Sequence, residues 1–318
     1  MPAPLITGWG KCLPPAVLSN TDLEALTDTT DDWISTRTGM KERRVSHVET
    51  SDLAAAAGRE ALAAAGLDPE GLDLVIVATC TPDRLVPSAA ALVQQKVGAT
   101  RAAAMDLNAA CSGFIYGLAV ADQMIRAGAV RRVLLIGAEK LHFFLDFSDR
   151  ATSVLFGDGA GAVVLEEAGE DGGLLAFELG ADGTAAEILC IPQSGTEGFP
   201  GTERRARVQM EGPTVFRRAV EAMGDSALRV LEKAGLGLDE VDLFIPHQAN
   251  LRIIEATARR LGLDASRVMV NLAAYGNTSA ASIPIALAEA LEQGRVRPGA
   301  LLVLAAFGGG LTWAAAAY

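Results

Sequence analysis

The sequence predicts a layered α/β protein made of two related halves, and two observations support this. Ala-rich helical patterns alternate with short continuous apolar runs such as 74–78 (LVIVA) and 133–136 (VLLI). Continuous apolar strands between helices are typical of sheets that are covered on both faces. The chain also repeats itself under an ungapped shift of 169 residues, so we expect the same order of elements twice.

The repeat is visible at several points along the chain. The matched positions are 65–67 with 234–236, Asp73 with Asp242, Asn108 with Asn277, Leu118 with Leu287, and 133–136 with 302–305. Chance could supply two such matches, but the shared order of helix, strand, small-residue turn, helix and strand indicates a duplication. We expect one half over 1–170 and the other over 171–318.

The remaining segments are predicted from their turn residues. The apolar run that follows 156–161 (FGDGAG) leads to the Gly-rich stretch 167–173, which is the expected junction between the halves. Segment 192–210 lacks periodicity and is rich in turn formers, so we expect a mobile loop of the kind that often acts as a lid. Late in the chain, an apolar strand stops at Pro246, and a glycine triplet at 308–310 follows the last long apolar run.

Composition excludes several functional classes. The chain has 318 residues, of which 50% are hydrophobic, so it is large enough for two buried cores. A net charge of −12 argues against nucleic acid as a partner, because phosphate binding needs clustered cations. Four scattered cysteines favour neither a disulfide framework nor a metal site, and they suggest a reducing, cytoplasmic location. We also expect no leader peptide and no membrane contact, because charge interrupts every apolar helical pattern.

Cys111 is the first candidate functional residue, and it lies in 107–114 (LNAACSGF), where a strand pattern ends and a helical pattern begins. A thiol at a helix N-terminus meets the positive end of the helix dipole and unpaired N–H groups, which favour the thiolate and can hold an oxyanion. A lone cysteine at such a junction is more often a small buried hydrophobe, so the local sequence leaves both interpretations open. Under the repeat Cys111 falls on Ala280, so only one half carries the thiol.

His247 and Asn277 are expected to approach Cys111. Asn277 lies in 276–282 (GNTSAAS), the counterpart of the Cys111 turn, and the two turns face each other if the halves pack about a pseudo-two-fold axis. His247 follows an apolar strand, and taken alone it is more often a structural histidine. All three residues and the glycine triplet nevertheless come at the carboxyl ends of predicted strands, where α/β sheets form their sites.

Six motifs in this order resemble those of the thiolase-superfamily condensing enzymes, specifically the β-ketoacyl-acyl-carrier-protein synthase III family. They are 32–39 (DWISTRTG), 107–114, 156–161, 246–250 (PHQAN), 276–282 and 307–310 (FGGG). The resemblance runs nearly end to end. It implies a duplicated five-layer αβαβα fold, a homodimer, and a catalytic triad of Cys111, His247 and Asn277.

The reaction that the resemblance implies is the decarboxylative condensation of an acyl-CoA primer with malonyl-acyl carrier protein, which initiates fatty-acid synthesis. Cys111 would take the acyl group while the N–H groups of Cys111 and Gly309 hold the oxyanion. His247 and Asn277 would donate hydrogen bonds to the malonyl thioester carbonyl as CO2 leaves. Both thioesters are substrates, and no cofactor or metal is implied.

The resemblance also implies three groups of binding residues. Around CoA these are Trp33 and Arg37 on either side of the adenine, Arg150 at the nucleotide, and Asn250 on the pantetheine tunnel. Around the acyl chain they are Val86, Phe143, Phe144, Phe156, Met210 and Phe307. For docking the acidic carrier protein they are Arg217, Arg218 and Arg252. A solvated helix face would explain Arg217 and Arg218 equally well.

Two positions depart from the family pattern. Val86 stands where the family often has a phenylalanine that is supplied across the dimer, so we expect a pocket for primers longer or more branched than acetyl. Leu311 also replaces a phenylalanine, and there we expect only a packing effect.

Three alternative functions stay open. A starter-unit or stand-alone condensing enzyme of a polyketide pathway would carry the same motifs. A thiolase running in reverse would need a second cysteine in a Gly-rich turn, and no other cysteine occupies one. A non-catalytic partner subunit would be expected to lack the thiol or its partners, yet all three residues are present.

Overall fold

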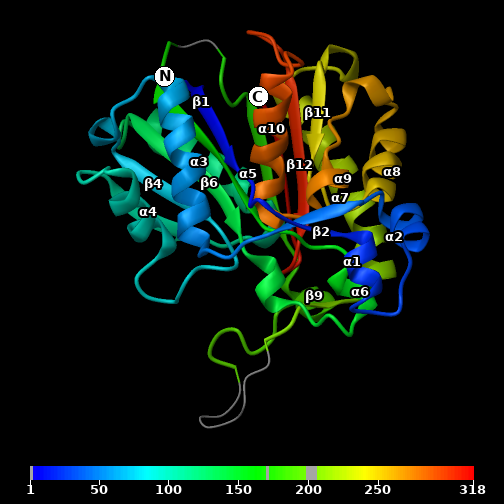
Figure 1. Ribbon diagram of the computed structural model, residues 1–318. Helices are drawn as coiled ribbons and strands as arrows, with labels where there is room; N and C mark the ends of the chain where they lie inside the picture. Colours follow the sequence, from blue (N-terminus) through cyan, green and yellow to red (C-terminus); the bar gives the residue numbers. More distant parts are fainter. Residues whose placement is uncertain (1–2, 170–171, 198–205) are drawn as a thin grey trace.

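In the computed structural model, which describes residues 3–169, 172–197 and 206–318, two β-sheets lie side by side with helices between and outside them (Figure 1). The first sheet has the strand order β1 (Pro4–Cys12), β7 (Gly159–Glu167), β6 (Arg132–Glu139), β4 (Leu74–Ala78) and β5 (Ala103–Leu107). The second has the order β11 (Leu243–Pro246), β12 (Leu302–Gly308), β13 (Thr312–Ala317) and β8 (Ala176–Ala181).

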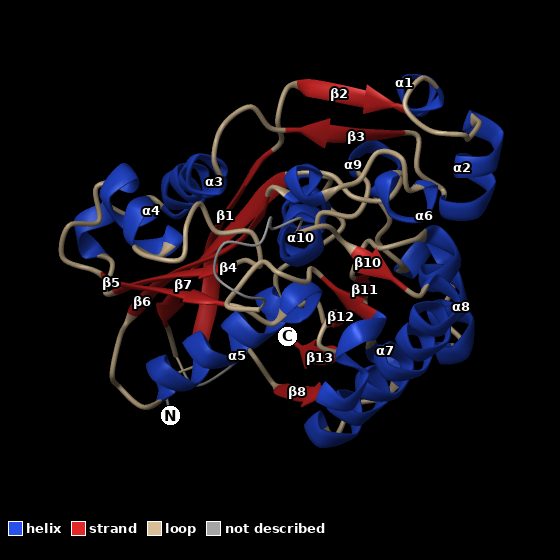
Figure 2. Ribbon diagram, turned by 90° about the horizontal axis from the view of Figure 1, so that it is seen from below, coloured by secondary structure: helices blue, strands red, loops and turns tan. Residues whose placement is uncertain are grey.

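The helices complete five layers, which Figure 2 shows from below. The outer layers are α3 (Thr50–Ala65) with α4 (Ala89–Val97) on the first sheet, and α7 (Gly212–Ala234) with α8 (Leu251–Leu261) on the second. The middle layer holds α5 (Gly113–Arg126) and α10 (Ser282–Glu292). The αβαβα arrangement expected from the resemblance is therefore confirmed.

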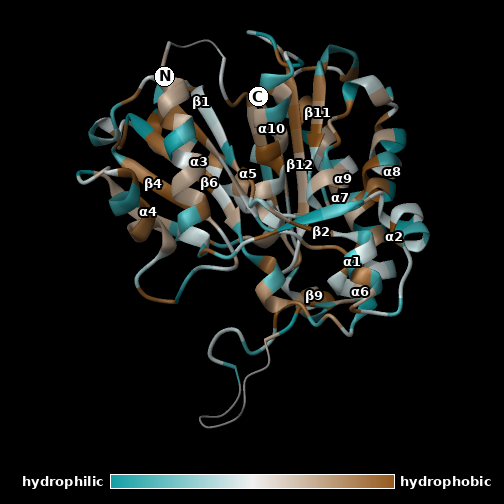
Figure 3. Ribbon diagram, viewed as in Figure 1, coloured by the Kyte–Doolittle hydropathy of each residue, from teal (hydrophilic) through white to brown (hydrophobic). Residues whose placement is uncertain are grey.

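Alternate strand residues supply different cores. In β4, Leu74 and Ile76 join the central core around α5 and α10, whereas Val75 and Val77 join the outer core under α3 and α4. All five residues of β4 are buried. A strand that is covered on both faces has no residues facing solvent, so polar residues do not alternate with apolar ones and its sequence is an unbroken apolar run. In Figure 3, β4 and β11 are brown accordingly.

The sequence repeat is also present in the backbone. Ala110 and Ser279, which are 169 residues apart, have left-handed φ angles of 46° and 48°. Each is preceded two residues earlier by an asparagine whose Oδ1 accepts its N–H: Asn108 to Ala110 at 3.1 Å and Asn277 to Ser279 at 2.8 Å. Two turns with the same unusual φ and the same side-chain bond therefore occupy equivalent places. The predicted boundary between the halves, at 170/171, lies outside the described residues.

Short elements gather at the end of the molecule where Figure 1 labels α6 and β9. The remaining strands and α-helices are β2 (Ala16–Ser19), α1 (Asn20–Glu24), α2 (Asp31–Thr38), β3 (Glu42–Val45), α6 (Arg150–Ser153), β9 (Leu189–Cys190), β10 (Gln209–Met210) and α9 (Leu272–Tyr275). The 3-10 helices are η1 (Pro69–Gly71), η2 (Ala110–Ser112), η3 (Leu141–Phe144), η4 (Gly183–Ile188), η5 (Leu238–Glu240), η6 (Ala265–Arg267) and η7 (Ser279–Ala281).

The segment 192–210 was expected to be one irregular loop, and this prediction is wrong at its end. Gln209 and Met210 pair with Cys190 and Leu189 as a short antiparallel ladder, β10 with β9. Residues 198–205 of the expected lid lie outside the described part of the chain. Leu311, as expected, is a packing residue: it is 1% exposed and belongs to the core beneath α7 and α8. In the described chain, every helix is too short or too polar to cross a membrane.

Candidate active site

Cys111 is the middle residue of η2, between β5 and α5, and its side chain is buried. The end of β12 packs directly against it. A Cβ built on Gly308 would lie 2.6 Å from the Cys111 backbone nitrogen and 3.0 Å from its Cβ. Only glycine permits this approach, which explains in physical terms why the glycine triplet follows the last apolar run.

The protonation of Cys111 differs from the expectation. Burial raises the pKa of the thiol to about 11, although a hydrogen bond with the Ser279 hydroxyl and those from the N–H groups of Cys111 and Gly309 lower it. The nearby Glu139 carboxylate raises it further. The predicted stabilisation of the thiolate is therefore outweighed by desolvation, and the resting residue is a thiol.

His247 directly follows β11 and is 2% exposed. Its N–H donates to the Ala305 carbonyl at 2.8 Å, and its Nδ1 lies 2.6 Å from Ser282 Oγ. The Gln248 N–H also donates to Ser282 Oγ, at 3.4 Å, so the serine oxygen accepts there and its O–H is left to donate a hydrogen bond to Nδ1. Burial lowers the pKa of His247 to about 3, so the ring is neutral, and this arrangement places its hydrogen on Nε2.

Asn277 is held by backbone bonds on both sides of its peptide. Its N–H donates to the Leu155 carbonyl at 2.8 Å, and its own carbonyl accepts the Gly157 N–H at 3.0 Å. Its Oδ1 accepts the Ser279 N–H, which leaves the amide NH2 as the group that the side chain can present as a donor. His247 and Asn277 thus each have their accepting atom occupied and a donating group remaining.

The three residues line one cavity of about 770 Å³. Its walls include the aromatic rings of Phe156 and Phe307, and its lining reaches Trp33 and Arg37. The sequence-predicted residues that the structure brings together here are Trp33, Arg37, Cys111, Phe156, Met210, His247, Asn250, Arg252, Asn277 and Phe307. Met210 and Phe307, which were expected around the acyl chain, thus line the larger cavity, the one that extends to Trp33.

A second cavity, of about 400 Å³, meets the first at Cys111, Phe156 and Leu189. Gly309 lines it, together with a mostly apolar wall that includes Leu141, Leu189, Ile191 and Val208. Cys80 also lines it, and sequence reasoning missed this residue because it follows β4 without any motif of its own. A narrow reacting centre between two cavities suits the transfer of a chain from one carrier to another.

At the opening of the larger cavity, the residues expected to bind CoA contact one another. The guanidinium of Arg150, not that of Arg37, stacks over the Trp33 ring, 4.7 Å from its centroid. Arg150 also donates to the Asp28 carbonyl at 3.0 Å. Asn250 caps α8 through its Oδ1 and donates from Nδ2 to the Arg37 carbonyl at 3.1 Å, so it fixes α8 against α2.

Three residues expected around the acyl chain, Val86, Phe143 and Phe144, do not line either cavity of this chain. Val86 is 84% exposed and Phe143 is 64% exposed, and the neighbouring Leu85 is 75% exposed. Phe144 packs in a small core with Leu141. The exposure of Val86 is that of a residue expected to be supplied across a dimer, and the roles of Val86 and Phe143 around the acyl chain stay predictions.

The three arginines expected to dock a carrier protein have different surroundings. Arg217 is exposed, and Arg218 forms an ion pair with Asp182 at 2.8 Å. Arg252 lines the larger cavity and lies over the Phe216 ring, 5.8 Å from its centroid. Within the described residues, no cluster of His, Cys, Asp or Glu is arranged to hold a metal ion.

Comparison with known proteins agrees with this geometry. The family model described as 3-oxoacyl-[acyl-carrier-protein (ACP)] synthase III matches residues 105–183, and the model of its C-terminal part matches 231–318. The β-ketoacyl-[acyl-carrier-protein] synthase III of Roseiflexus castenholzii (strain DSM 13941 / HLO8) is 55% identical over 318 residues, covering 98% of this chain and 96% of its own.

Two solved structures share the fold closely. The crystal structure of the β-ketoacyl-[acyl carrier protein] synthase III from Thermus thermophilus has a TM-score of 0.93 at 50% identity and covers 98% of each chain. The priming β-ketosynthase of the R1128 polyketide pathway also has a TM-score of 0.93, at 36% identity, over 99% of this chain and 95% of its own. The higher identities favour the fatty-acid enzymes over the polyketide one.

Proposed function

Because the chain belongs to the β-ketoacyl-acyl-carrier-protein synthase III family, we propose how its own residues carry out the family's reaction. The chain is an acyltransferase that condenses an acyl-CoA primer with malonyl-acyl carrier protein, releases CoA and CO2, and initiates fatty-acid synthesis. The observation that carries the assignment of roles is that Cys111, His247 and Asn277 line one cavity and that Cys111 also lines the second.

In the first half-reaction, acyl-CoA lies in the larger cavity with its adenine at Trp33 and Arg150 and its pantetheine passing Asn250. The Cys111 sulfur attacks the thioester carbon, and the acyl chain enters the smaller cavity. The backbone N–H groups of Cys111 and Gly309 hold the oxyanion of the tetrahedral intermediate. This assignment is supported by the hydrogen bonds that both N–H groups make to the resting sulfur, because an oxyanion formed there lies within their reach.

In the second half-reaction, the malonyl thioester replaces CoA in the larger cavity. His247 Nε2–H and the Asn277 amide donate hydrogen bonds to the thioester carbonyl, so the enolate that forms as CO2 leaves is stabilised. The rings of Phe156 and Phe307 exclude water, which strengthens both bonds and protects the carbanion before it attacks the acyl-Cys111 carbonyl. Decarboxylation takes the place of a strong base, so the proposed reaction needs no cofactor besides its two thioester substrates.

An acidic carrier protein suits the basic residues near the cavity opening. Arg252 lies on the cavity wall, and Arg217 is exposed one helix away on α7. We assign these two arginines the larger share of docking, because Arg218 already has Asp182 as a partner. Acyl-CoA is a cytoplasmic metabolite and the carrier protein is a cytoplasmic partner. We therefore place the reaction in the cytoplasm.

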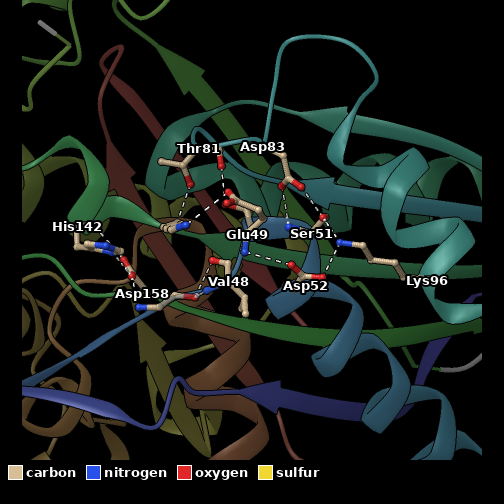
Figure 4. A network of polar contacts seen from close by, with 12 residues as sticks. Val48, Glu49, Ser51, Asp52, Thr81, Asp83, Lys96, His142 and Asp158 are labelled. Carbon is tan, nitrogen blue, oxygen red and sulfur yellow. Dashed lines mark hydrogen bonds and ion pairs between the residues drawn. The ribbon is translucent and has the colours of Figure 1, made fainter.

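A homodimer accounts for the exposed apolar residues Leu85, Val86 and Phe143. Their two loops are joined where the Lys140 N–H donates to Thr81 Oγ1 at 2.9 Å. Figure 4 shows how each is anchored: Asp83 accepts the Ser51 N–H at 2.8 Å, and His142 bonds Asp158. Rigid loops that present apolar tips to solvent are typical of a permanent interface. Across it, Val86 of one chain would reach the acyl cavity of the other.

Disrupting this surface is expected to separate the chains. Replacing Leu85 and Val86 together by aspartate should raise the dimer dissociation constant at least about tenfold, because charges would be buried without partners. Sedimentation velocity over a concentration series measures it. Leu228→Asp is the matched control, since Leu228 is also an exposed apolar residue but lies on α7, and it should leave the dimer intact. An unaltered chain that sediments as a monomer would refute the dimer.

The smaller cavity predicts the primers that the enzyme accepts. Its volume of about 400 Å³ and its apolar wall favour branched or medium-length chains. We expect kcat/KM for isobutyryl-CoA and hexanoyl-CoA, measured with malonyl-carrier protein, to equal or exceed that for acetyl-CoA. Val86→Phe, which restores the aromatic ring of the family, should lower the hexanoyl value about tenfold relative to acetyl. A strong preference of the unaltered enzyme for acetyl would contradict the prediction.

A further inference from the structure

Glu139 is a fully buried carboxylate beside the active site to which neither the reaction nor the sequence motifs assign a role. It ends β6, which is apolar over 133–138, and its counterpart under the repeat is Gly308, which packs on Cys111. Among the described residues its partners are hydroxyl, thiol and amide groups rather than a cation. They are Thr79 Oγ1 at 3.2 Å, Cys80 N–H at 3.2 Å, Cys80 Sγ at 3.3 Å, Thr81 Oγ1 at 2.6 Å and Ser279 Oγ at 3.0 Å.

Ser279 connects this carboxylate to the nucleophile. Its hydroxyl donates to Glu139 Oε1 at 3.0 Å, so its oxygen is left to accept the Cys111 S–H, and Ser279 and Cys111 line the same smaller cavity. Ser279 has a φ of 48°, a conformation uncommon for residues other than glycine and often found at functional sites. Its counterpart Ala110 adopts the same φ without a hydroxyl, so the turn itself does not require one.

From this geometry we propose that Glu139, acting through the Ser279 hydroxyl, accepts the proton that Cys111 loses when it is acylated. The inference rests on the proposed acylation of Cys111 by acyl-CoA. The Cys111 S–H bond breaks and its proton passes to Ser279 Oγ, while the proton of that hydroxyl passes to Glu139. The sulfur forms a bond to the acyl carbon, the C–S bond to CoA breaks, and the CoA thiolate recovers the proton by the reverse shift.

The surroundings favour Glu139 over the other candidate base. His247 has its Nδ1 bonded to Ser282, and burial makes the ring a poor proton acceptor by lowering its pKa to about 3. Burial raises the pKa of Glu139 from its ordinary value, so the carboxylate holds a proton more readily than an exposed one. The titratable groups that face Glu139 are the thiols of Cys80 and Cys111, and the adjacent Lys140 directs its amine to Glu49 at 3.5 Å.

The test measures the rate of Cys111 acylation by acetyl-CoA, before any condensation, in Glu139→Gln and Ser279→Ala. Glutamine has the size of glutamate, and alanine fits the Ser279 turn because Ala110 occupies the equivalent one. We expect each variant to slow acylation near neutral pH at least about tenfold, and the double variant to be no slower than the worse single one, since both interrupt one path. Acylation by the unaltered enzyme should also fall at acidic pH as Glu139 becomes protonated, and Glu139→Gln should lack this limb.

A merely electrostatic role for Glu139 predicts the opposite sign. Its negative charge raises the pKa of Cys111, so removing the charge would favour the thiolate and speed acylation. Faster or unchanged acylation in Glu139→Gln would therefore overturn the proposal. Thr81→Val gives a second readout: the Thr81 bond lowers the Glu139 pKa, so its loss should move the acidic limb to higher pH. If the unaltered chain forms no acyl-enzyme at any pH, it is the proposed function that fails.

Discussion

Cys111→Ala is expected to abolish both acylation and condensation. The variant should gain no mass when mixed with an acyl-CoA, whereas the unaltered chain should gain one acyl group on Cys111. Among the residues that the structure describes, only Cys111 combines the meeting point of the two cavities with N–H groups placed for an oxyanion. Because the Cys111 sulfur itself forms the bond to the acyl group, no other group can replace it. The kcat/KM for condensation should therefore fall by at least about 10⁴-fold.

Intact-protein mass spectrometry and a condensation assay check this prediction. Cys12→Ala is the matched control, because Cys12 is a free cysteine on β1 outside both cavities, and this variant should keep the adduct and the activity. An adduct that persists in Cys111→Ala would place the nucleophile elsewhere, with Cys80 as the first candidate in the same cavity. An unaltered chain that takes no acyl group from any primer would favour a non-catalytic partner subunit.

The fold could be predicted from the sequence because its causes are local or periodic. Strands buried on both faces appear as unbroken apolar runs, and the repeat appears as identical residues at turns that carry the same bonds. Asp73 and Asp242 illustrate this: the first accepts the Arg132 N–H at 2.9 Å and the second accepts the Leu301 N–H at 2.8 Å. Because a carboxylate closes the equivalent loop in each half, the sequence has an aspartate at both matched positions of the repeat.

The site was only partly predictable, because several of its contacts join elements far apart in the chain. Ser282 was visible as one residue of a motif, but its bond to His247 depends on how α10 meets β11. In the sequence, Glu139 has the pattern of a polar residue at the end of a strand. Its hydrogen bond from Ser279, 140 positions away, is evident only in the structure. A possible signal was the single acidic residue that ends the apolar run 133–138, opposite a glycine in the other half.

Burial and orientation explain the expectations that the structure corrects. The helix start that was expected to stabilise a Cys111 thiolate does contribute hydrogen bonds, but full burial outweighs them. The stacking of Arg150 on Trp33 depends on the position of α6 beside α2, and no sequence motif indicated this contact. Val86 and Phe143 are exposed apolar residues on surface loops, and their roles around the acyl chain stay predictions.

His247→Ala and Asn277→Ala should each slow malonyl decarboxylation by about 10²–10³-fold, the usual cost of removing one preorganised donor from a developing oxyanion. The two donors act on one carbonyl oxygen, so the losses should not add in the double variant. Asn277→Asp should lose more than Asn277→Ala, since it replaces the donor by a charge that repels the enolate. Release of CO2 from malonyl-carrier protein, measured without a primer, reports this step alone.

The pH dependence separates a neutral donor from a protonated one. An ordinary histidine loses its proton as pH rises through about 6.5, so a charged His247 would make decarboxylation fall over that range. Because burial lowers the pKa of His247 to about 3, the ring is already neutral there and its contribution should stay constant. His47→Ala, which removes an exposed histidine, should match the unaltered enzyme.

Acylation of Cys111 should survive in His247→Ala and Asn277→Ala, since both side chains act after the acyl-enzyme has formed. If acylation is lost while decarboxylation persists, the two half-reactions have been assigned to the wrong residues.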